Sequence, residues 1–156
     1  MAPRDTREFP LIYFAHPITD YSNEYYESDI ETQAIHMIET MLPYKVLNPN
    51  QPIHAQNYNK AKKEKGNGML YFLGEVLPLC HAGILMPFKE NHLGSGLFGA
   101  GVHKEGAYFL RHNLPLYEIT RDLDIIKLEK IPEHRKLNVE QTRAVLKELT
   151  TLVTMS

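Results

Sequence analysis

Glu105 is a candidate catalytic group because of its neighbours in the sequence. It follows the most glycine-dense segment of the chain, with glycines at positions 94, 96, 99 and 101, and it precedes Gly106 and Ala107. We expect it in the first turns of a helix, where free backbone N–H groups and the helix dipole lower the pKa of a carboxyl group. The small neighbours would let a flat or ring-shaped ligand approach. Glu105 is therefore either a nucleophile or electrostatic stabiliser, or a charge that only stabilises its helix.

Other polar candidates follow the ends of short apolar runs or lie close to Glu105. They are Tyr13, His16, Asn48, Glu90, His92 and His103. In an open parallel sheet, ligands bind beyond the carboxyl ends of the strands, near the point where the strand order reverses. We therefore expect these side chains to gather at one edge of the sheet.

The elements that must position these residues alternate along the sequence between short apolar runs typical of strands and longer segments with helical spacing. β-branched or aromatic runs predict strands at 11–15, 44–47, 82–86, 116–120 and 124–128. Apolar residues at helical spacing predict helices at 28–41, 69–79, 102–112 and 139–153, the last with Asn138 as N-cap and Gln141 three residues on. This alternation predicts an α/β fold: a three-layer sandwich with a five-stranded, mostly parallel sheet in the flavodoxin-like order 2-1-3-4-5.

Composition limits the class of protein. The 156 residues, 43% hydrophobic, suffice for one domain over 1–156, and a net charge of -2 disfavours binding along a nucleic-acid backbone. No apolar run approaches the roughly 20 residues of a membrane-spanning helix. The single cysteine, Cys80, lies in an apolar stretch and is expected to be a buried, inert thiol. We expect a cytoplasmic protein that does not bind membranes.

Metal and phosphate-loop motifs are missing from the sequence. The eight histidines include no convincing pair at His-x-x-x-His spacing with an acidic ligand nearby, so we expect no metal. The glycines at 94–101 are not followed by Lys and then Ser or Thr, as a phosphate loop requires. We therefore expect no cofactor.

Residues 48–52 and 60–65 are expected to form loops. The prolines at 49 and 52 predict an irregular loop after the second strand. Residues 60–65 hold four lysines and one glutamate, and we interpret them as a solvated, mobile loop, with phosphate capture as the alternative.

Taken together, the motifs over residues 11–120 resemble the nucleoside 2-deoxyribosyltransferase family. Residues 12–17 (IYFAHP) are similar to the family's opening strand, and 99–110 (GAGVHKEGAYFL) to its glycine-rich approach to a catalytic Glu. Residues 114–117 (LPLY) match the strand that follows. The chain departs from the family at Cys80 and His81, where an Asp is usual, and at 102–104, where Gly-Thr is usual.

The resemblance implies cleavage of the N-glycosidic bond of a nucleoside or nucleotide. Glu105 would be the nucleophile that captures C1′ of an oxocarbenium-like sugar, with Tyr13 orienting its carboxylate by a hydrogen bond. The departing base needs a proton, for which His16, His92 and His103 are candidates. Release of the sugar to a second base gives transfer, and release to water gives hydrolysis.

Other residues are expected to bind the substrate. Asn48 and Glu90 are candidates for polar contacts. Leu97 and Phe98 could form a lid over an apolar base pocket, with Met86 and Phe88 as its floor; alternatively, all four are ordinary core or loop-anchoring residues.

Two other functions fit the same pattern. Toll/interleukin-receptor-like NAD hydrolases also combine a flavodoxin-like sheet with a catalytic Glu, and a non-catalytic nucleotide sensor would use the same cleft without an aimed carboxylate. In each case the expected partner is a small-molecule nucleoside or nucleotide, and we expect a homo-oligomer.

Overall fold

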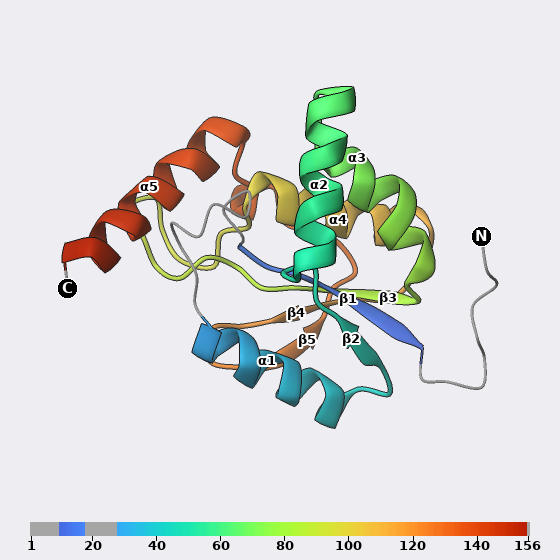
Figure 1. Ribbon diagram of the computed structural model, residues 1–156. Helices are drawn as coiled ribbons and strands as arrows, with labels where there is room; N and C mark the ends of the chain where they lie inside the picture. Colours follow the sequence, from blue (N-terminus) through green and yellow to red (C-terminus); the bar gives the residue numbers. More distant parts are fainter. Residues whose placement is uncertain (1–9, 18–27, 156) are drawn as a thin grey trace.

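The sheet has the predicted strand order. The structure, a computed structural model, describes residues 10–17 and 28–155. Its strands are β1 (Leu11–Ala15), β2 (Lys45–Leu47), β3 (Ala82–Leu85), β4 (Leu116–Ile119) and β5 (Ile125–Lys127). They lie in the order β2-β1-β3-β4-β5 (Figure 1), with β5 antiparallel to β4 and the other neighbours parallel. The α/β fold with flavodoxin-like order is therefore confirmed.

Helices cover both faces of this sheet and make the outer layers. On one face, α1 (Ser28–Met41) packs Ala34 and Ile38 against alternate residues of β1 and β3. On the other face lie α2 (Pro52–Lys65), α3 (Met69–Tyr71) and α4 (Ala100–Arg111). A π-helical turn (Phe72–Val76) and a 3₁₀ turn (Leu77–Leu79) continue α3 toward β3, so the helix predicted at 69–79 is present in distorted form.

The last helix, α5 (Val139–Met155), packs beside the segment that follows β3. Asn138 and Gln141 form the expected reciprocal cap: the Gln141 N–H donates to Asn138 Oδ1 at 2.8 Å, and the Asn138 N–H to Gln141 Oε1 at 3.0 Å. Val145 and Leu149 pack against Phe88. Among the described residues, no helix has both the length and the apolar character that crossing a membrane requires.

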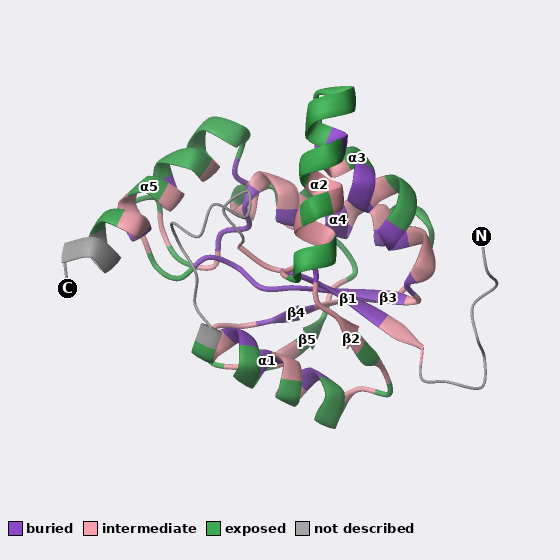
Figure 2. Cartoon of the chain, viewed as in Figure 1, coloured by how far each residue is buried: buried purple, intermediate pink, exposed green. Residues whose placement is uncertain are grey.

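The loop expected at 60–65 is wrong, because these residues form the second half of α2. Pro52 begins this helix, since a proline in the first turn gives up no intrahelical hydrogen bond. Gly66 ends it with φ of 76°, and three lysines lie in the last turn, where the helix dipole favours cations. Only Ala61 of α2 is buried, and Figure 2 shows the helix mostly exposed. A helix with so little buried surface has no apolar stripe by which to predict it.

Two glycines let α4 approach the sheet closely. A Cβ on Gly83 of β3 would lie 2.4 Å from the ring of Phe109, and one on Gly106 would lie 2.8 Å from Leu85 Cδ1. The expectation that Gly106 makes room for a ligand is thus wrong, because Gly106 faces the sheet. This packing directs the neighbouring Glu105 toward β1.

Candidate active site

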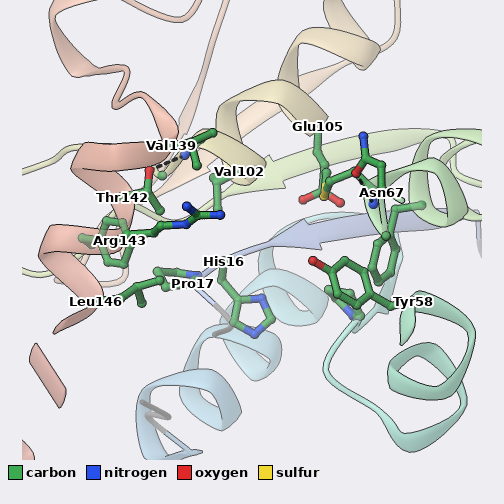
Figure 3. A pocket seen from close by; sticks show the side chains of 18 of the residues that line it. His16, Pro17, Tyr58, Asn67, Val102, Glu105, Val139, Thr142, Arg143 and Leu146 are labelled. Atoms are coloured by element: carbon green, nitrogen blue, oxygen red, sulfur yellow. Dashed lines mark hydrogen bonds between the residues drawn. The ribbon is translucent and has the colours of Figure 1, made fainter. Parts of the chain in front are cut away.

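A cavity of about 650 Å³ lies beyond the carboxyl ends of β1 and β3. Its floor holds Tyr13 and Glu105, one wall comes from α2 and the start of α3, and the opposite wall comes from α5 and the first turn of α4. Figure 3 shows Tyr58 and Asn67 on one side and Thr142 and Arg143 on the other. The cavity therefore occupies the position where open α/β sheets bind ligands, at the reversal of the strand order.

Tyr13 and Glu105 meet at this floor, as the sequence predicted for the end of the first strand. The Tyr13 hydroxyl donates a hydrogen bond to Oε2 of Glu105, and the two residues are 1% and 6% exposed. The Tyr13 ring is fixed between Phe72 and Phe109, with ring centres 6.1 and 6.5 Å away. Within the described part of the chain, Oε1 of Glu105 accepts no hydrogen bond and remains available to a ligand.

The pKa of Glu105 is shifted in the direction opposite to the one expected. Burial raises it to about 8, and the hydrogen bond from Tyr13 lowers it by a smaller amount. Glu105 is the sixth residue of α4 and not part of its first turn, and the helix dipole acts only within that turn. At neutral pH Glu105 is therefore mainly the neutral carboxyl, with a pKa in the range useful for proton transfer.

His16 lines the cavity and is held by three neighbours. Its ring stacks on Phe14 with centres 4.1 Å apart, Nδ1 lies 2.9 Å from the Phe14 carbonyl oxygen, and Nε2 lies 2.8 Å from Oε2 of Glu31. Asn50 donates a further hydrogen bond to the same Glu31 oxygen at 3.0 Å. Both ring nitrogens thus face oxygen atoms of neighbouring residues, and these contacts fix the orientation of the ring.

Four of the predicted polar candidates lie outside the cavity. Asn48 accepts a hydrogen bond from the Asn50 N–H at 3.0 Å in a local turn, and Glu90 is exposed. His92 pairs with Glu148 of α5. His103 lies 2.8 Å from the Leu137 carbonyl oxygen, since two residues along a helix turn the side chain about 200° away from Glu105.

The apolar candidates divide between the cavity and the core. Phe88 lines the cavity, but Phe98 is completely buried under the guanidinium of Arg135, 4.4 Å from its ring centre. Leu97 packs in the core beneath α5, and Met86 lies in the core on the α1 face of the sheet. The lid predicted from Leu97 and Phe98 is therefore wrong. The Phe98 N–H donates to the Arg135 carbonyl at 2.7 Å and the Phe98 carbonyl accepts from the Leu137 N–H at 3.0 Å, and both hydrogen bonds hold this segment in place.

Several cavity residues escaped the sequence analysis. Tyr58 was missed because α2 was not predicted; its ring lies over Gly68, where a Cβ would be 2.4 Å away. Asn67 and Phe72 complete that wall. On the other wall, Val139, Arg143, Leu146 and Lys147 come from a second stripe of α5, at helical spacing beside its buried stripe. The sequence pattern alone gives no signal that this stripe borders a cavity.

The cavity holds one carboxyl group and several cationic side chains. Among the described lining residues, Glu105 is the one acid, and Lys62, Arg143 and Lys147 carry positive charge. The described residues contain no group of three His, Cys, Asp or Glu placed to hold a metal ion. The arrangement thus offers an acid–base or nucleophilic carboxyl inside a positively charged rim.

Comparisons with protein-family models, with curated proteins and with solved structures find no match to this chain. The assignment of a function therefore depends on the geometry of the site.

Proposed function

We propose that this protein cleaves the N-glycosidic bond of a nucleoside or nucleotide, with Glu105 as the nucleophile. The observation that carries the proposal is a buried carboxyl group at the floor of a cavity of about 650 Å³, held on one oxygen by Tyr13 and open on the other. The resemblance of residues 11–120 to the nucleoside 2-deoxyribosyltransferase family supports the same chemistry.

The proposed reaction proceeds in two displacements. In the first, an oxygen of the Glu105 carboxylate bonds to C1′, and the electron pair of the C1′–N bond leaves with the base, which takes a proton. Of the three histidines considered as proton donors, His16 is the one that lines the cavity. In the second, water or another base attacks C1′ and releases Glu105, so the configuration at C1′ is retained.

The environment of Glu105 fits this use of the carboxyl. Positive charge develops on the sugar in the transition state and stabilises the carboxylate more strongly there than in the empty site. Tyr13 acts as a positioning residue, because its hydroxyl holds Oε2 and leaves Oε1 directed at the ligand. Because burial raises the pKa of Glu105, the carboxyl is mainly neutral without substrate and becomes charged during the reaction.

The cavity offers aromatic surface to the base. Tyr58 and Phe72 lie on the wall formed by α2 and α3, Phe88 lies beside α5, and such rings suit the flat face of a nucleobase. Asn67 accepts a hydrogen bond from the Met69 N–H on Oδ1 at 3.0 Å, and its amide N–H₂ can donate to a ring nitrogen or carbonyl of the base.

A chromatographic assay for free base tests the proposal. Incubation with nucleosides, nucleoside monophosphates and NAD should release base from at least one nucleoside or monophosphate, and Glu105→Gln should lower the rate by about 1000-fold or more, as loss of a nucleophile does. Glu90→Gln is the matched control, because Glu90 is an exposed carboxylate outside the cavity; its rate should not change.

Other outcomes of this assay contradict the proposal. Release from NAD alone indicates an NAD hydrolase, and binding without release of base indicates a nucleotide sensor.

Adding a second, labelled base to the reaction separates transfer from hydrolysis. Labelled base incorporated into nucleoside shows transfer, and free sugar at every base concentration shows hydrolysis.

A further inference from the structure

The cationic side chains of the cavity gather on the wall formed by α5. Arg143 and Lys147 lie one helical turn apart on the face that lines the cavity, and Lys62 of α2 contributes from the other wall. Figure 3 shows the Arg143 side chain extending from α5 toward Val102 of α4. Two positive charges at this spacing repel each other, and an anion between them and the cavity would relieve the repulsion.

Among the described residues, Arg143 and Lys147 have no acidic partner, unlike Arg135. Arg135 is used structurally, since its guanidinium binds both carboxylate oxygens of the buried Glu118, at 2.8 and 2.5 Å. Within the described ranges 10–17 and 28–155, neither Arg143 nor Lys147 forms an ion pair. Their charge is therefore available to a ligand in the cavity.

The position of Arg143 relative to Glu105 is set by a hydrogen bond between two helices. Thr142 Oγ1 accepts from the Ala100 N–H at the start of α4 at 2.8 Å and donates to the Asn138 carbonyl at 2.8 Å. Ala100 lies five residues before Glu105, about 7.5 Å along the axis of α4. A pentose with its C1′ at Glu105 can extend its 5′ substituent across this distance toward Arg143.

We infer that the ligand of this cavity carries a phosphate on C5′ of its sugar and that Arg143 and Lys147 bind this phosphate, which makes the substrate a nucleoside 5′-monophosphate and not a free nucleoside. The inference rests on the proposed function for the placement of C1′. The guanidinium of Arg143 presents parallel N–H groups that match two phosphate oxygens, and Lys147 supplies a second charge. The first turn of α4 lines the same part of the cavity and adds backbone N–H groups.

Calorimetric binding to the full-length Glu105→Gln variant tests this inference without turnover. The probes are a nucleoside, its 5′-monophosphate, ribose 5-phosphate, inorganic phosphate and NAD. We expect the monophosphate to bind at least ten-fold more tightly than the nucleoside, with an advantage that shrinks as salt is raised. Adding Arg143→Gln should remove most of that advantage and leave the affinity for the nucleoside unchanged; Lys147→Gln should act in the same direction.

Arg111→Gln is the matched control, because Arg111 ends α4 and does not line the cavity. It should leave both affinities unchanged. Equal affinity for nucleoside and monophosphate overturns the inference, as does an Arg143→Gln variant that weakens both ligands equally. Tighter binding of NAD or of inorganic phosphate than of the monophosphate overturns the assignment to a mononucleotide.

The two proposals fail in different ways. Tight, Arg143-dependent binding of the monophosphate, with no base released by the unmodified protein, supports the phosphate site and contradicts the proposed cleavage. Release of base at equal kcat/KM from nucleoside and monophosphate supports the cleavage and contradicts the phosphate site.

Discussion

At the scale of single residues, Glu105 shows where sequence reasoning succeeds and where it stops. The sequence predicted its partner Tyr13, because strand ends converge at one edge of a parallel sheet. It gave the wrong direction for the pKa, because burial depends on what packs over the side chain. Tyr58 and Arg143 were missed for a related reason: nothing local in the sequence tells which face of an exposed helix borders a cavity.

The raised pKa of Glu105 predicts the pH dependence of base release. A nucleophile must be ionised, so kcat/KM should rise with pH and level off above the pKa of about 8. The measurement is initial rate at low substrate concentration from pH 5 to 10, with circular dichroism at each pH to confirm folding. A rate that instead falls above pH 8 would show Glu105 acting through its proton, as a general acid, and would contradict nucleophilic attack.

Removing the Tyr13 hydroxyl should change both the rate and its pH dependence. Tyr13→Phe deletes one hydrogen bond to a buried carboxylate, a loss of about 1–3 kcal/mol, which corresponds to a 10- to 100-fold lower kcat. Because this hydrogen bond lowers the pKa of Glu105, the pH at which the rate levels off should move upward. A lower rate with an unchanged pH profile would indicate that Tyr13 only packs against the core.

At the scale of elements, strongly patterned segments were predictable and weakly buried ones were not. The four strands β1 to β4 and the capped start of α5 follow from short apolar runs and from the reciprocal Asn138–Gln141 hydrogen bonds. The α2 helix was missed because it buries little and carries its lysines on all sides. Since α2 contributes Tyr58 and Lys62 to the cavity, missing this helix left part of one wall unpredicted.

The close contact between α4 and β3 gives a prediction about stability. Gly83→Ala places a methyl group 2.4 Å from the Phe109 ring, which is fully buried, so the ring must shift at a cost of about 1–3 kcal/mol. Phe109 also packs on Tyr13, so the rate of base release should fall together with the stability.

Gly74→Ala is the control for this substitution. Gly74 is exposed, and nothing lies within 4 Å of the added methyl group. Alanine there should increase the stability by about 0.4–1 kcal/mol. Urea denaturation measures both, and equal effects of the two substitutions would refute the packing argument.

At the scale of the whole molecule, the fold was predictable because strands alternate with helices along the sequence, a pattern typical of a mostly parallel α/β sheet. The cavity was not, because its walls come from α2, α4 and α5, which are far apart in the sequence. The distances between these helices depend on contacts such as the hydrogen bond between Thr142 and Ala100, which no sequence pattern predicts. The general location of the site therefore followed from topology, and its charge and shape required the packed structure.

The buried carboxyl of Glu105 should also affect the stability of the whole molecule. In the unfolded chain it loses its proton near pH 4.5, whereas in the folded protein it keeps the proton up to about pH 8. The folded state binds one more proton within this window, so the free energy of unfolding contributed by Glu105 falls as pH rises from about 4.5 to 8, by up to about 1.4 kcal/mol per pH unit, and is constant outside it. Glu105→Gln abolishes this dependence.

The difference in unfolding free energy between the native protein and Glu105→Gln isolates the effect, because titration of all other groups cancels. Urea titrations at pH 4, 6, 7, 8 and 9 should show the native protein losing stability relative to the variant up to pH 8 and no further. A difference that is constant with pH would mean that Glu105 gains and loses its proton at the same pH in the folded protein as in the unfolded chain. The same result would place its pKa near the ordinary value and would remove the basis for the predicted rise of base release toward pH 8.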